Sequence, residues 1–156
     1  MPLDSRLLSV YIIAFFIYSY VGATLEHLSY YGQKLFNPSK YLPKCLSNSV
    51  ITGFPLYGIG AFVVVGIHHF VKDIPLALQF FVYGAVLSAM EFTVGCFVGA
   101  GCTVDGTVPA WDYTDQPYNI GGKISLRHFI SWGLLGILVS WLHPVIVRKI
   151  KGGITA

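Results

Sequence analysis

Charged residues are scarce in this 156-residue chain, at 11% of the composition. An average soluble domain carries about a quarter, so the chain has too few charges to cover a surface that faces water. Hydrophobic residues account for 54%, and the mean hydropathy is +0.65. The composition therefore predicts an integral, multi-pass membrane protein.

Cysteines are also few, because the chain has three and no Cys-x-x-Cys pair. A zinc knuckle or a thioredoxin-like motif is therefore not expected. Cys45 and Cys102 fall in polar segments predicted to lie on the same side of the membrane, so a disulfide and two free thiols both stay open. A Ser-His-Asp signature is missing, and Gly121-Gly122-Lys123 does not fit the phosphate-binding loop. We therefore expect no ATPase in this chain.

The excess of one sign of charge is small as well. The formal net charge is +3, and the basic residues flank the apolar runs without forming a stripe. This pattern favours membrane lipids as partners over nucleic acid. Basic residues divide evenly between the two predicted sides, and only the C-terminal cluster of Arg148, Lys149 and Lys151 favours cytoplasmic termini. The sequence does not indicate which membrane holds the protein.

Four long apolar runs are present, and they cover residues 7–31, 51–71, 75–99 and 128–147. About 20 apolar residues form a helix that crosses the hydrocarbon core. Gly53 and Pro55 interrupt the start of the second run, so we expect its regular helix to begin near Leu56. Pro75 suits the first turn of the third helix. The sequence predicts an all-α polytopic membrane protein, with four transmembrane helices in one domain over residues 1–156.

Residues 100–127 form the longest polar segment, just before the fourth helix. Their aspartates, prolines and glycines exclude a helix through lipid. The aromatic side chains of Trp111, Tyr113 and Tyr118 indicate a packed loop. Long loops without regular structure are usually functional or disordered, and we interpret this one as structured and functional.

A local pattern occurs twice in the chain. Phe15-Phe16-Ile17-Tyr18 is followed by Glu26, and Phe80-Phe81-Val82-Tyr83 is followed by Glu91, at an offset of 65 residues. An aromatic-Gly-x9-His pattern also recurs at an offset of 75, in Tyr57-Gly58 to His68 and Trp132-Gly133 to His143. We interpret residues 7–71 and 75–147 as two copies of a two-helix unit. Two helices per unit give both copies the same orientation, as in parallel repeats; chance resemblance is the alternative.

The two glutamates lie inside apolar runs, where a carboxylate is costly and usually functional. At 1.5 Å per residue, Glu26 lies roughly 28 Å from the start of its run and Glu91 roughly 24 Å from the start of its own. Both acids are therefore expected at the same far side of the membrane. Tyr57, Trp132 and the polar loop are expected at that side too.

Two nearby carboxylates in a low dielectric cannot both ionise cheaply. They could share a proton, hold a cation, or be neutralised by Lys123 or Arg127. The first two arrangements suit proton-coupled or cation-linked transport, and the third suits a structural lock. With Asp112, Glu26 and Glu91 would form an oxygen-rich set for Mg²⁺, Ca²⁺ or Na⁺. A bound cation is therefore the one cofactor that the sequence suggests.

Several motifs occur in an order that is similar to a known family. They are Gly53-Phe54-Pro55-Leu56-Tyr57-Gly58-Ile59-Gly60-Ala61, Glu91-Phe92-Thr93-Val94-Gly95, Trp111-Asp112-Tyr113-Thr114, Asn119-Ile120-Gly121-Gly122-Lys123-Ile124 and Trp132-Gly133. With Glu26 in the first helix, they resemble the putative type IV ABC-transporter permease (CmpB-like) family of small four-helix membrane proteins. The resemblance implies a polytopic protein and, for an ABC component, a separate ATPase subunit. Val98 stands where members of this family often carry a further acid.

We predict a permease-like protein that binds or translocates a small polar or cationic solute, as a homo-oligomer or with an ATPase partner. The candidate binding residues are Glu26, Glu91, Asp112, Trp111, Tyr113, Asn119, Tyr57 and Trp132. No residue is assigned a catalytic role. Two alternatives stay open, namely an intramembrane metal-dependent or acid/base enzyme acting on a lipid-like substrate, and a non-catalytic structural membrane protein.

Overall fold

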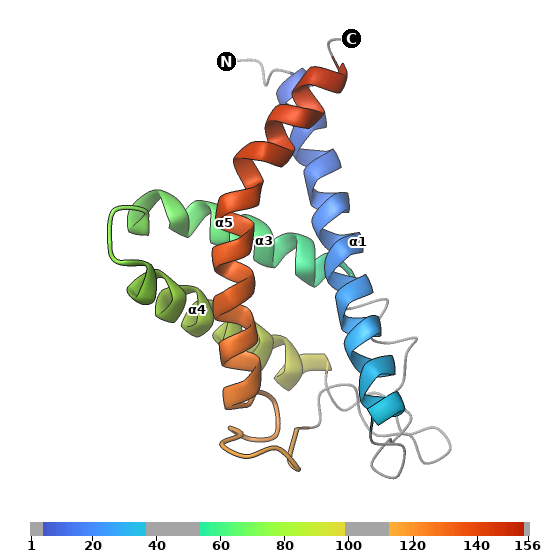
Figure 1. Ribbon diagram of the computed structural model, residues 1–156, viewed down its shortest axis with the longest axis vertical. Helices are drawn as coiled ribbons and strands as arrows, with labels where there is room; N and C mark the ends of the chain where they lie inside the picture. The colour runs from blue at the N-terminus through green and yellow to red at the C-terminus, as the bar shows by residue number, and fades with distance from the viewer. Residues whose placement is uncertain (1–4, 37–53, 99–112, 155–156) are drawn as a thin grey trace.

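The computed structural model describes residues 5–36, 54–98 and 113–154. All four α-helices in these ranges are long and apolar enough to cross a membrane. They are labelled as in Figure 1: α1 (Ser5–Phe36), α3 (Phe54–Val71), α4 (Leu76–Val98) and α5 (Leu126–Ile154). The described residues contain no strand, and their one isolated bridge joins Ile120 and Ile124. The predicted all-α, four-helix membrane fold is therefore confirmed.

The first and last helices extend beyond their predicted spans. The sequence predicts the first span at 7–31, whereas α1 runs from Ser5 to Phe36. It predicts the fourth at 128–147, whereas α5 runs from Leu126 to Ile154 and passes through Pro144. Hydropathy marks the lipid-facing part of a helix, and the helical backbone continues past it into polar sequence. Membrane helices tolerate an internal proline where neighbouring groups satisfy the freed carbonyl.

The second membrane helix begins earlier than the sequence predicts. Its regular part is expected from about Leu56, but α3 begins at Phe54. Pro55 therefore lies in the first turn, where the missing N–H removes no intrahelical hydrogen bond. Pro55 therefore lies at the start of α3 and does not interrupt the helix.

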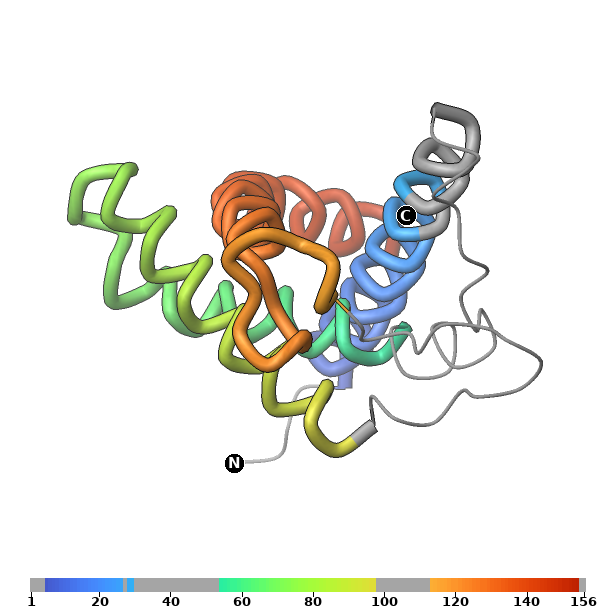
Figure 2. Tube along the Cα trace, turned by 90° about the horizontal axis from the view of Figure 1, so that it is seen from below, coloured from blue at the N-terminus to red at the C-terminus, as the bar shows by residue number. Residues whose placement is uncertain are grey.

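The four helices form two pairs, which we call the α1/α3 pair and the α4/α5 pair. Among the four described helices, the packing within each pair is the most extensive, and α3 also contacts α5. The two long helices α1 and α5 converge near the chain termini, and the α3–α4 hairpin lies across them (Figure 1). Seen from below, the turn of this hairpin projects to one side, away from α1 and α5 (Figure 2).

Glycines allow close approach within each pair. Gly58 of α3 faces the ring of Phe15 on α1, and Gly133 of α5 faces the ring of Phe80 on α4. Neither position has room for a β-carbon. Membrane helices rely on van der Waals packing of this kind because lipid is as apolar as the side chains, so helices gain little from the hydrophobic effect.

Residues related by the two repeat offsets make matching contacts. Phe16 and Phe54 lie 6.3 Å apart between ring centroids at an interplanar angle of 46°, and their counterparts Phe81 and Phe129 lie 6.2 Å apart at 43°. The Phe15–Gly58 and Phe80–Gly133 contacts correspond in the same way. These contacts agree with two units at 7–71 and 75–147, while duplication itself stays a prediction.

Candidate functional site

Glu91 of α4 is buried, with 4% of its surface exposed. Its Oε1 accepts a hydrogen bond from the hydroxyl of Tyr113 at 3.1 Å, and its Oε2 accepts one from the indole Nε1–H of Trp132 at 2.6 Å. Tyr113 precedes α5, and Trp132 lies in the second turn of that helix. One carboxyl group therefore fastens both the loop and α5 to α4.

Glu26 of α1 accepts a hydrogen bond from the hydroxyl of Tyr57 at 3.1 Å. Tyr57 lies in the first turn of α3, and its ring packs against Trp132 with 5.8 Å between centroids. Gly22 of α1 faces the Tyr57 ring and leaves no space for a β-carbon, which lets the two helices approach. A continuous chain of contacts thus runs from Glu26 through Tyr57 and Trp132 to Glu91.

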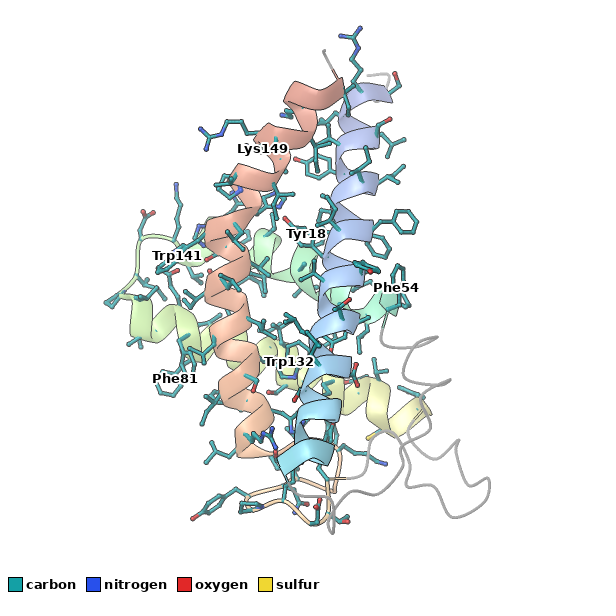
Figure 3. The ribbon with its side chains drawn as sticks, turned by 45° about the vertical axis from the view of Figure 1, so that its right-hand side comes forward. Tyr18, Phe54, Phe81, Trp132, Trp141 and Lys149 are labelled. Atoms are coloured by element: carbon teal, nitrogen blue, oxygen red, sulfur yellow. The ribbon has the colours of Figure 1, made fainter. Side chains whose placement is uncertain are left out.

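The two tryptophans of α5 differ in their surroundings. In Figure 3, Trp132 lies in the interior near the crossing of the helices, and Trp141 lies on the outside of α5. Trp141 is 60% exposed, as expected for a side chain that meets lipid. The site therefore uses one tryptophan of this helix and leaves the other at the lipid-facing surface.

The hydroxyl of Tyr113 lies within the electrostatic influence of both glutamates. Burial, followed by the negative charges of Glu91 and Glu26, raises the pKa of Tyr113 well above its ordinary value. The phenol therefore stays neutral at physiological pH and acts as a donor to Glu91. Its ring stacks on His128 at a centroid distance of 3.9 Å. The two acids thus share one electrostatic environment.

The loop that carries Tyr113 is held by its own hydrogen bonds. The backbone N–H of Tyr113 donates to the carbonyl of Gly122 at 2.8 Å, and Asn119 Oδ1 accepts from the N–H of Gly122 at 3.0 Å. Asn119 Nδ2 also donates to the carbonyl of Gln116 at 2.8 Å. Gly121 and Gly122 have φ values of 57° and 65°, which glycine adopts at little cost. The amide of Asn119, predicted to bind a ligand, is therefore engaged in shaping this loop.

Some predicted features lie outside the described residues. These are Trp111 and Asp112, as well as the pair Cys45 and Cys102. Among the described residues, no group of three or more His, Cys, Asp or Glu side chains could hold a metal ion. A metal set of Glu26, Glu91 and Asp112 therefore rests on the sequence alone.

Two hydrogen bonds that the sequence did not predict connect the repeated motifs. Tyr18 Oη lies 2.8 Å from His143 Nδ1, and Tyr83 Oη lies 2.8 Å from His68 Nδ1. Each pair joins the Phe-Phe-x-Tyr motif of one unit to the histidine of the other. Both motifs are visible in the repeat pattern, but their exchange between units depends on how the helix pairs pack.

The fold and the site define a polytopic four-helix membrane protein in which a buried and a half-buried glutamate accept hydrogen bonds from aromatic side chains at one end. The chain belongs to the family described as "Putative ABC-transporter type IV", whose model matches residues 13–154. This confirms the family that the sequence motifs resemble, and it makes the chain an ABC-transporter-related membrane protein. Comparison with curated proteins and with solved structures found no significant match.

Proposed function

We propose that this protein is permease-like and binds a small polar or cationic solute at Glu26 and Glu91 for transfer across the membrane. The chain of contacts Glu26–Tyr57–Trp132–Glu91 is the observation that carries the proposal. Acids within membrane spans are costly and commonly mark ion or substrate pathways. The transporter family of the chain supports the same class of function.

The chemistry of the site favours a cation among these solutes. Two carboxylates that act on one phenol, that of Tyr113, repel each other unless positive charge compensates them. Protons or a cationic solute supply that charge. Indole can only donate, so Trp132 keeps Oε2 of Glu91 as an acceptor. A tyrosine hydroxyl can donate or accept, so Tyr113 tolerates Glu91 either charged or protonated on Oε1.

The solute site lies, in this proposal, between the α1/α3 pair and the α4/α5 pair. Transporters built from repeats commonly bind their solute at the interface between the repeats. The matching contacts of the two pairs support this arrangement. The chain has no phosphate-binding loop, so ATP-driven transport would need a separate ATPase subunit; a homo-oligomer is the other assembly that we consider. The basic residues that end α5 favour cytoplasmic termini.

Binding tests the proposal without an ATPase partner. The probes are Na⁺, K⁺, Mg²⁺ and methylammonium, titrated against the purified protein in detergent and followed by intrinsic tryptophan fluorescence. We expect saturable binding of at least one probe, weakened at least about tenfold by Glu26→Gln or Glu91→Gln. Each change removes a negative charge that attracts the cation, and opposite charges about 4 Å apart near a protein surface attract by roughly 4 kcal/mol, more than the roughly 1.4 kcal/mol that corresponds to tenfold. Asp73→Asn, which removes a carboxylate from the exposed α3–α4 turn, should bind as the unaltered protein does.

Glutamine is suited to this test because it keeps the packing. Its carbonyl can accept from Trp132, and its amide can donate to the hydroxyl of Tyr113. Circular dichroism establishes that each variant is folded. A folded protein that binds none of the probes, or equal binding by the glutamine variants, would contradict the proposed function.

A further inference from the structure

The polar contacts of the repeated motifs fall into two classes. Glu26–Tyr57 joins α1 to α3, and Glu91–Trp132 joins α4 to α5, so both acid contacts lie within a helix pair. The tyrosine–histidine bonds lie elsewhere. Tyr18–His143 joins α1 to α5, and Tyr83–His68 joins α3 to α4, so both connect one pair to the other.

The tyrosines of these two bonds are also buried. Tyr83 is 0% exposed and Tyr18 is 8% exposed. The ring of Tyr11 stacks on the imidazole of His143, with 6.4 Å between ring centroids and an interplanar angle of 15°. A broken bond at either position leaves a buried hydroxyl and a half-buried imidazole in need of partners, which is costly in an apolar surrounding.

The two tyrosines lie about two turns away from the acids along α1 and α4. Tyr18 and Tyr83 each precede the glutamate of their helix by eight residues, roughly 12 Å of axial rise. His68 and His143 each follow the aromatic residue of their own helix, Tyr57 or Trp132, by eleven residues, roughly 16 Å of axial rise. The tyrosine–histidine bonds therefore form a layer of their own, apart from the acid site.

From this division we infer that Tyr18–His143 and Tyr83–His68 form a paired gate between the two helix pairs, in a layer apart from the acids. The role of this gate rests on the proposed function, since the gate would control access to the solute site. A movement of the α1/α3 pair against the α4/α5 pair breaks both bonds and leaves both acid contacts intact. Such movement of one repeat against the other is a common route of alternating access.

The two halves of the gate differ in one detail. The hydroxyl of Tyr83 has a second partner, the Oε1 atom of Gln79 at 3.5 Å, and Gln79 Nε2 donates to the carbonyls of Lys72 and Ile74 in the α3–α4 turn. The bond between Tyr83 and His68 is thereby connected to that turn. The bond between Tyr18 and His143 lacks such a connection among the described residues, so we expect it to open more readily.

Spin-label distance measurements on the full chain in nanodiscs test the gate. The native cysteines, three in all, are first replaced. The spin labels are then attached at four exposed positions: Ser9 on α1, Phe70 on α3, Leu78 on α4 and Lys149 on α5. Ser9–Lys149 and Phe70–Leu78 report distances between the pairs. The other two combinations, Ser9–Phe70 and Leu78–Lys149, report distances within a pair.

The double variant Tyr18→Phe/Tyr83→Phe should lengthen or broaden both distances between the pairs and leave both distances within a pair unchanged. Losing two interhelical hydrogen bonds of the average strength found in membranes shifts the ratio of closed to open molecules by roughly eightfold. Tyr20→Phe removes a hydroxyl from an exposed side chain of α1 and should leave all four distances unchanged.

Single variants keep the test decisive if the double variant does not fold. Tyr18→Phe should change the Ser9–Lys149 distance more than the Phe70–Leu78 distance, and Tyr83→Phe should do the reverse. Unchanged distances between the pairs, or equal changes within the pairs, overturn the gate. Neither result depends on solute binding, so the gate can fail while the proposed function stands, and the reverse holds too.

Discussion

The variant Gly133→Leu is expected to lose the packing of α5 on α4 and to unfold readily in detergent. A β-carbon at Gly133 would lie 2.5 Å from the ring of Phe80. That ring has little freedom to move, because it contacts Phe81 at 5.4 Å and Phe129 at 6.1 Å between centroids. Overpacking a tight core costs roughly 1–3 kcal/mol and occasionally more, and a leucine side chain exceeds what this interface absorbs.

Thermal unfolding in detergent, followed by far-ultraviolet circular dichroism, measures this effect. Gly66→Leu is the matched control, since Gly66 lies on α3, where an added β-carbon would have no neighbouring atom within 4 Å. The control should keep the unfolding temperature of the unaltered protein within a few degrees. An unaltered unfolding temperature for Gly133→Leu would contradict the close packing of α4 and α5.

The counterpart of this variant in the other pair is Gly58→Leu. Here the added side chain meets the ring of Phe15 and the hydroxyl of Ser19. If the two helix pairs are equivalent units, both substitutions should lower stability by similar amounts. A large effect at one glycine and none at the other would weigh against equivalent packing of the two pairs.

The depth of the acid site could be predicted from the sequence. The position of a residue along a helix follows directly from its number and the rise of about 1.5 Å per residue. Counting residues therefore placed Glu26, Glu91, Tyr57 and Trp132 at one end, and the structure brings these side chains into contact. Hydropathy likewise indicated the four helices, because the need to satisfy backbone groups in lipid leaves few alternatives.

The pairing of individual atoms could not be predicted in the same way. It depends on the rotation and crossing of whole helices, which residue counting does not contain. The bond between Tyr18 and His143 joins residues 125 positions apart. Similarly, hydropathy offered no reason for α5 to continue past Val147, because three of the next four residues, Arg148, Lys149 and Lys151, are basic.

The variant Glu91→Ala is expected to destabilise the protein far more than Glu91→Gln. Alanine leaves the hydroxyl of Tyr113 and the indole N–H of Trp132 without their acceptor. A buried donor without a partner costs roughly 1–3 kcal/mol, so two such donors cost about 2–6 kcal/mol before any relaxation. Glutamine offers one acceptor and one donor, and the tyrosine hydroxyl can reverse its role to suit them.

The loss should appear first at the loop that Tyr113 anchors. In Glu91→Ala, proteolysis between residues 113 and 125 should accelerate, and the unfolding temperature should fall by several degrees or more. In Glu91→Gln the rate of proteolysis and the unfolding temperature should stay near the values of the unaltered protein, even where cation binding is lost. Equal unfolding temperatures for the two variants would mean that neither hydrogen bond stabilises the fold. Glu91 would then act through its charge alone, and the coupling of the loop to the acid site would be wrong.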